Sequence, residues 1–127
     1  IPIQCEFYAL DGLTQLLDTI KAVRATVNGQ LQMEGLLRTM FDPRNNLCAD
    51  VSAQLERHFG DKVFAAVIPR NVRLAEAPSH GQPIIQYDKA SRGAQAYLAL
   101  AEEIVARNKS AKAAISKNTP KRDSLKN

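Results

Sequence analysis

Near the start of the chain, apolar residues recur three and four positions apart, with polar residues between them. The apolar positions are Leu10, Leu13, Leu16, Leu17, Ile20, Val23 and Val27. This spacing predicts an amphipathic helix from about Tyr8 to Thr26, because such residues share one helix face. Asn28 and Gly29 follow, and since both tolerate a left-handed backbone we expect them to end the helix.

Two later stretches change to the short apolar runs that are typical of buried strands. They extend from Gln32 to Met40 and from Lys62 to Ile68. Pro69 is expected to end the second strand, because proline cannot donate a ladder hydrogen bond. The opening residues, Ile1-Pro-Ile-Gln4, resemble the end of a buried strand rather than a natural start. We therefore expect the chain to be a piece of a longer protein, or a truncated relative of one.

Two further helices are expected, one after each strand. The first extends from about Asn46 to Phe59, and Gly60 is its expected stop. The second extends from Arg92 to about Arg107, with Ser91 as its N-cap. The expected buried face of this last helix consists of Ala94, Tyr97, Leu98, Ala101, Ile104 and Val105.

Strands that alternate with helices indicate an α/β fold, in which helices cover a parallel sheet. Residues 1–107 supply only two strands and a stub at Ile1, so we expect the rest of the sheet to lie outside this chain. Alone, the chain would leave an apolar sheet edge open, which predicts poor solubility or self-association.

The 127 residues carry a net charge of +4, but this charge is unevenly distributed. Residues 109–127 hold six basic side chains and one acidic side chain, so residues 1–108 carry a net charge of −1. Residues 108–127 are rich in Ser, Lys, Ala and Asn, which predicts a basic disordered tail. The tail lacks a dense apolar face and no apolar run reaches the ~20 residues of a membrane span, so no membrane partner is expected.

Few residues outside the strand ends carry a pattern typical of chemistry. Cys5 and Cys48 lack metal-binding spacing, which favours a reduced, cytoplasmic protein. His58 and His80 have no nucleophile or carboxylate at a telling distance in sequence, so no catalytic residue is assigned. Residues 74–85 are expected to form a short helix broken by Pro78, and no chemistry is assigned to them.

Four motifs follow one another in a fixed order. They are Ile1-Pro-Ile-Gln-Cys-Glu-Phe-Tyr-Ala-Leu-Asp-Gly-Leu13, Thr39-Met-Phe-Asp-Pro-Arg-Asn-Asn-Leu47, His58-Phe-Gly-Asp-Lys-Val63 and Val67-Ile-Pro-Arg-Asn-Val-Arg-Leu-Ala-Glu-Ala-Pro-Ser-His-Gly-Gln-Pro-Ile-Ile85. Together they resemble the C-terminal half of the ParA/Soj family of chromosome- and plasmid-partitioning ATPases, over residues 1–107. The resemblance implies the C-terminal portion of a doubly wound, mainly parallel-sheet P-loop NTPase fold.

The family's phosphate-binding loop has no counterpart in the sequence. Its glycines are isolated, and no Gly-Lys-Ser or Gly-Lys-Thr triplet occurs. A phosphate cradle needs consecutive inward-facing N–H groups and a lysine that reaches the β- and γ-oxygens. The resemblance therefore implies that ATP and Mg²⁺ belong to the intact protein, and that this chain alone neither hydrolyses ATP nor binds it tightly.

The two strand ends are the expected nucleotide-binding positions, because ligands of doubly wound folds lie beyond the C-terminal ends of the strands. The resemblance assigns contacts with the adenine ring to Thr39, Met40, Pro69 and Asn71. Apolar Met and Pro faces suit a flat ring, and Asn suits its exocyclic amine. The alternative is structural: Pro69 only ends a strand and Asn71 only caps the next turn.

Arginines in the same loops are the expected DNA contacts. The resemblance assigns non-specific DNA binding to Arg44 and Arg73, with Arg70 as a further contact and Lys89 and Arg92 as weaker candidates. Arginine suits this role because its planar fork binds phosphate oxygens and keeps its charge. Alternatively, Arg73 forms a surface ion pair with Glu76 or Asp42, worth under ~1 kcal/mol.

Two functions remain open from the sequence. In the first, the chain is part of a partitioning ATPase that forms an ATP-dependent homodimer, coats nucleoid DNA in the cytoplasm and acts with a ParB-type partner on a chromosome or plasmid. In the second, it is a truncated, non-catalytic module that binds DNA or an intact homologue. A module would be soluble and folded alone, whereas a fragment would aggregate through its open sheet edge.

Overall fold

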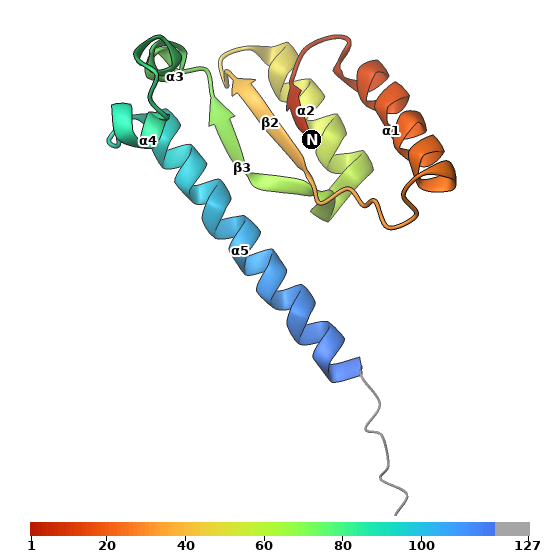
Figure 1. Ribbon diagram of the computed structural model, residues 1–127. Coiled ribbons are helices and arrows are strands. Elements are labelled where there is room, and N and C mark those ends of the chain that lie inside the picture. The colour runs from red at the N-terminus through yellow and green to blue at the C-terminus, as the bar shows by residue number, and fades with distance from the viewer. Residues whose placement is uncertain (119–127) are drawn as a thin grey trace, which may run out of the picture.

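The computed structural model describes residues 1–118, with side chains described as far as Ala111 (Figure 1). Its elements are β1 (Pro2–Gln4), α1 (Ala9–Thr26), β2 (Leu36–Phe41), α2 (Asn46–Phe59), η1 (Gly60–Lys62), β3 (Val63–Pro69), α3 (Val72–Glu76), η2 (Ala77–His80), α4 (Ile84–Tyr87) and α5 (Arg92–Asn118).

The three described strands form one parallel sheet in the order β1-β2-β3. Ile3 of β1 pairs with Arg38 of β2, and Arg38 pairs with Val67 of β3. Each connection between neighbouring strands contains a helix, as parallel strands require. The α/β class expected from the alternation of elements is therefore confirmed.

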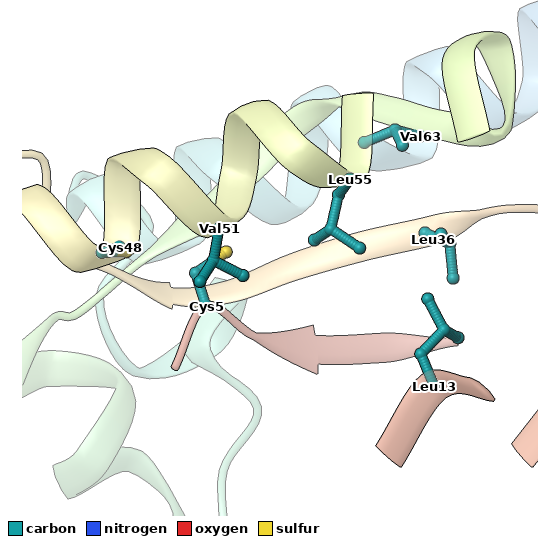
Figure 2. Packing of buried hydrophobic residues seen from close by; sticks show 7 residues of the cluster. All are labelled: Cys5, Leu13, Leu36, Cys48, Val51, Leu55 and Val63. Carbon is teal, nitrogen blue, oxygen red and sulfur yellow. The ribbon is translucent and has the colours of Figure 1, made fainter. Parts of the chain in front are cut away.

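The main core lies where α1 and α2 pack on the sheet. Figure 2 shows its buried residues, which are Cys5, Leu13, Leu36, Cys48, Val51, Leu55 and Val63. Leu36 of β2 and Leu55 of α2 are completely buried within it. A second, smaller cluster of Ala77, Ile84 and Ala94 joins η2 and α4 to the start of α5. The loop region after β3 is thus anchored separately from the main core.

A buried arginine, Arg38, links β2 to α2 and to β3. Arg38 donates hydrogen bonds to Ser52 Oγ (2.9 Å) and to the Phe64 carbonyl (2.8 Å), and it pairs with Glu56. These contacts offset part of the cost of burying a guanidinium group, while the buried Arg38 Nε has no partner among the described residues. They also fix α2 and β3 against the middle strand of the described sheet.

The boundaries of α2 agree with the sequence. Asn45 caps its start by accepting a hydrogen bond from the Cys48 backbone N–H. Gly60 follows its end with a left-handed φ of 51°, which favours glycine. β3 also lies close to its expected range, and Ser91 caps α5 as expected through the Ala94 N–H. Strong caps therefore made these ends predictable.

α1 ends at Thr26 as expected, but the left-handed cap expected at Asn28 and Gly29 is wrong. Val27, rather than a left-handed Asn28 or Gly29, follows the last helical residue, and its φ of −116° is ordinary. The Val27 and Asn28 N–H groups both bond to the Val23 carbonyl, which ends the helix without a left-handed residue. The expected start of β2 also needs correction, because the strand begins at Leu36 rather than Gln32.

The expected end of α5 at about Arg107 is wrong as well, because the helix continues to Asn118 and projects beyond the sheet (Figure 1). The first part of the expected disordered tail is therefore helical, while residues 119–127 lie outside the described residues. The expected buried face is only partly correct: Ala94 is buried, but Tyr97, Leu98 and Val105 are exposed.

Polar contacts help to hold α5 against β3. The Glu103 carboxylate accepts hydrogen bonds from the Ala65 N–H (3.0 Å) and the Ala66 N–H (2.9 Å). Arg107 binds Glu103, donates to the Val63 carbonyl and stacks over Phe64 with its guanidinium 4.4 Å from the ring centre. β3 is thus covered by α5 along its outer edge.

Candidate functional site

The ends of β2 and β3 lie side by side. Phe41 pairs with Pro69, and the Arg70 N–H donates a 3.0 Å hydrogen bond to the Phe41 carbonyl. A groove of about 480 Å³ opens here, lined by Phe41, Pro43 and Pro69 and by Arg92 at the start of α5. The two loops expected to bind a ligand are therefore neighbours in space.

Met40 adopts an unusual backbone conformation just before the end of β2. Its φ of 51° makes it the one non-glycine residue with a positive φ within residues 1–118. The register between β2 and β3 shifts between Arg38 and Phe41, and the Met40 side chain is 42% exposed. Such strain persists only where surrounding structure imposes it, and it is concentrated at functional sites.

The four proposed adenine contacts are not gathered in one groove. Pro69 lines the groove, whereas the half-buried Thr39 donates from its hydroxyl to the Ile3 carbonyl at 3.4 Å, on the β1 side. Met40 is exposed beside the strand end and is not among the groove-lining residues. The site is therefore an open surface around two strand ends rather than an enclosed cavity.

Asn71 has the capping role that the sequence left open. Its Oδ1 accepts a hydrogen bond from the Leu74 N–H at 3.3 Å and begins α3. Gly93 lets α5 start against this cap, because a Cβ there would lie 2.4 Å from Leu74 Cγ and 3.1 Å from Asn71 Oδ1. This role uses the oxygen of Asn71, and its amide nitrogen bonds to none of the described residues.

Arg44 lies on the turn after β2 and is already paired. Its Nε and Nη2 bind the two carboxylate oxygens of Asp42, at 3.0 and 2.9 Å. The Arg44 backbone N–H also donates to Asp42 at 3.0 Å. These hydrogen bonds from Arg44 lower the pKa of Asp42 to about 2, so the carboxylate stays charged at neutral pH.

Arg73, on α3, also has carboxylate partners. It bonds to Glu76 at 3.0 Å and approaches Asp88 at 3.4 Å, so the ion pair with Glu76 that the sequence suggested is present. Asp42, the other suggested partner, is instead bound to Arg44. Hydrogen bonding to Glu76 raises the pKa of Arg73, which keeps its charge fixed.

Arg70 differs from Arg44 and Arg73 in its side-chain partners. It is exposed at the end of β3, and its side chain pairs with no carboxylate among the described residues. Lys89 and Arg92 are exposed nearby, in the stretch that begins α5. Among the three arginines expected to contact DNA, Arg44 and Arg73 share their charge with carboxylates, whereas Arg70 pairs with no described carboxylate.

Two features of this region were missed from the sequence. The bond between Asp42 and Arg44 was not foreseen, although a tight Asp-Pro-Arg turn is a local signal for it. The sequence showed only that Cys5 and Cys48 lack metal-binding spacing, whereas in the structure both are buried in the main core. Burial raises the pKa of the Cys5 thiol to about 11, and the neighbouring Cys48 adds to the rise. Nothing local in the sequence signals that proximity.

The chain matches known proteins over most of its length. Residues 4–84 match the family described as the CobQ/CobB/MinD/ParA nucleotide binding domain. The chain is 53% identical over 109 residues to the chromosome partitioning protein ParA of Caulobacter vibrioides, covering 86% of this chain and 41% of that protein. It is 57% identical over 106 residues to the sporulation initiation inhibitor protein Soj of Bacillus subtilis, covering 84% and 42%.

A third relative is the chromosome-partitioning ATPase Soj of Thermus thermophilus, 55% identical over 107 residues, covering 84% of this chain and 43% of that protein. The chain thus spans about two fifths of the length of these curated relatives. Within the described residues, no helix is long and apolar enough to cross a membrane. The parallel sheet and its helices form part of a P-loop NTPase fold, and the chain belongs to the ParA/Soj members of the CobQ/CobB/MinD/ParA family.

Proposed function

We propose that this chain is part of a ParA/Soj-type ATPase that forms an ATP-dependent dimer, binds DNA non-specifically and segregates a chromosome or plasmid with a ParB-type partner. The observation that carries this proposal is the identity of more than half of the aligned residues to partitioning relatives. That alignment extends over most of the chain. The expected location is the cytoplasm, on the nucleoid.

The strand ends suit the base of a nucleotide better than its phosphates. Met40 and Pro69 offer apolar surface to a flat ring, and Asn71 offers an amide nitrogen that can donate to a ring nitrogen. Thr39, which precedes Met40 in β2, would be a further contact of the base. The 127 residues contain no phosphate-loop triplet, so ATP phosphates and Mg²⁺ would be held by residues outside this chain.

The arginines suit a DNA backbone. Arg44, Arg70 and Arg73 all follow strand ends and are exposed, so a phosphate can approach each of them. Their planar guanidinium groups retain charge at any physiological pH. Non-specific DNA affinity comes from such phosphate contacts, and each contact contributes to the salt dependence of binding.

The test measures DNA affinity of the full-length gene product with ATP, at several salt concentrations, for Arg73→Ala. We expect weaker DNA binding, unchanged ATP binding, and a slope of log affinity against log salt that flattens by about 0.9, the value for one lost phosphate contact. Arg57→Ala is the matched control, because Arg57 is exposed in the last turn of α2, at the opposite end of the sheet.

Equal effects of both substitutions would reveal a general charge effect and count against the proposed DNA surface. Retention of full affinity and slope by the Arg73→Ala protein would remove Arg73 from the surface. Loss of ATP binding along with DNA binding would place Arg73 in the nucleotide site instead.

A further inference from the structure

The pair formed by Asp42 and Arg44 is an internal contact on the proposed DNA surface. Asp42 is bound by the Arg44 side chain through two parallel hydrogen bonds and by the Arg44 backbone N–H through a third. The Asp42 carbonyl also accepts from the Asn45 N–H at 3.1 Å, which closes the turn. The carboxylate is therefore fixed by the turn itself, whereas the arginine reaches it with a flexible side chain.

Burial differs between the two partners. The Arg44 side chain is 87% exposed, while that of Asp42 is 24% exposed. A phosphate can therefore reach the guanidinium from solvent, but it meets a group whose Nε and Nη2 donors are already in use. The phosphate would also lie close to the negative charge of Asp42, which is hydrogen-bonded to the same arginine, and like charges at such distances repel.

Arg70 lies within the influence of the same carboxylate, because its positive charge contributes to the lowered pKa of Asp42. Asp42 therefore reduces chiefly the field of Arg44, and that of Arg70 only slightly. Arg73 is restrained separately, by Glu76 and Asp88. The acidic side chains of this region are placed where they weaken phosphate binding.

We propose that Asp42 sets the DNA affinity of this surface by holding Arg44 in an ion pair that a phosphate must displace. This inference rests on the proposed DNA-binding function. Asp42 would act on DNA binding through Arg44. Removal of Asp42 should therefore strengthen DNA binding, whereas removal of Arg44 should weaken it.

The test compares DNA affinity and salt slope of the full-length gene product with ATP for Asp42→Asn, Arg44→Ala and the double variant. Asn keeps an oxygen that accepts the Arg44 N–H and so preserves the turn, but it removes the negative charge. We expect Asp42→Asn to tighten binding about threefold, the equivalent of one surface ion pair, and to steepen the salt slope by up to about 0.9.

Asp18→Asn is the matched control. Asp18 is an exposed carboxylate paired with Lys21 at 3.1 Å on α1, so its loss makes the same charge change and also releases a cation. We expect the Asp18→Asn protein to bind DNA within the error of the unsubstituted protein. We also expect the gain from Asp42→Asn to vanish when Arg44 is alanine.

Each other outcome is decisive. Weaker binding by Arg44→Ala together with no gain from Asp42→Asn would overturn the role of Asp42 and leave the DNA-binding proposal standing. A gain that persists in the double variant, or that Asp18→Asn reproduces, would also overturn it. No effect of Arg44→Ala and Arg73→Ala would reject the proposed DNA surface, and with it the inference.

Discussion

At the residue scale, Met40 is held in a left-handed conformation at the end of an otherwise extended strand. A side chain with a Cβ is disfavoured there by roughly 1–2 kcal/mol, because the Cβ crowds the following carbonyl. Met40 lies between the shifted β2–β3 register at Arg38 and Phe41 and the capped turn at Asp42. Strain at this position is consistent with a binding role, which would select the residue for its side chain rather than for stability.

Replacement of Met40 by glycine and by alanine separates strain from packing. We expect the Gly variant to be more stable than the Ala variant by about 1 kcal/mol, because only glycine is unstrained at this φ. Met33, half-buried and without a positive φ, is the control, where alanine should be at least as stable as glycine. Urea unfolding of the four variants of the full-length gene product measures the differences, and an Ala variant as stable as Gly at position 40 would argue against strain.

Cys5 gives a second prediction at this scale. Because its folded pKa is about 11 against an ordinary value near 9, the folded state favours the thiol form. The stability that the folded state gains from this raised pKa is fully present below about pH 9 and is lost as pH rises towards 11. At pH 8, we expect iodoacetamide to alkylate Cys5, followed on its own peptide, at least about 100-fold more slowly in the folded than in the urea-unfolded state. Similar rates, measured by mass spectrometry, would mean that the thiol is accessible and unshifted.

At the element scale, the contact between α5 and β3 depends on charged groups. Glu103 satisfies two neighbouring N–H groups at the edge of β3, and Arg107 holds Glu103 in place. Burial of Glu103 opposes ionisation, but the hydrogen bonds from Ala66 and Ala65 outweigh it, and its pKa is lowered. The helix thereby covers an edge that could otherwise pair with another strand.

We expect Glu103→Ala to lower the free energy of unfolding by about 1–3 kcal/mol, because it leaves strand N–H groups unpaired. Glu102→Ala, at the exposed neighbouring position, should change it by less than about 0.5 kcal/mol. Since the folded pKa of Glu103 is lowered, its contribution exists above the unfolded pKa and disappears as pH falls. Urea titrations at neutral and acidic pH measure both effects, and equal losses for the two variants would contradict the account.

The ends of the helices and strands show which local sequence signals mark an element boundary. The end of α2 was predictable because Gly60 marks it chemically, and its start agrees with the expected Asn46. The full length of α5 was missed because residues after Arg107 lose the apolar period, although Ala and Lys favour helix by propensity alone. The start of β2 was missed because Leu31 and Met33 alternate with Gln32 and Glu34 in a strand-like pattern, although the strand begins only at Leu36.

For the site, the sequence placed the strand-end loops but not their contacts. The paired hydrogen bonds from Arg44 to Asp42 depend on the conformation of one turn. The positions of Thr39 and Met40 depend on a register shift within the sheet. The approach of Cys5 to Cys48 depends on strand pairing between distant segments. Local patterns specify none of these.

At the scale of the whole molecule, the described chain has one protected and one open sheet edge. β3 is covered by α5, whereas β1 is paired only with β2 among the described strands. Large apolar side chains are exposed after β1, with Phe7 at 73% and Tyr8 at 74%, and further ones lie on α5. These surfaces suit packing against additional protein.

Residues 1–127 produced alone should therefore self-associate. We expect sedimentation or light scattering to give a mass that rises with concentration above the 14.0 kDa of the chain, because open edges and exposed apolar surface promote association at about micromolar concentrations and above. A folded species of constant 14.0 kDa mass up to about 100 μM would contradict this and favour an autonomous binding module.

In the intact protein, the ends of β2 and β3 are proposed to hold the base of the nucleotide. Photolabelling of the full-length gene product with 8-azido-ATP, followed by peptide mapping, tests this most directly. We expect label, displaced by excess ATP, on the peptides that contain Thr39 and Met40 or Pro69 and Asn71. ATP-sensitive label found only on peptides away from these two strand ends would contradict the claim.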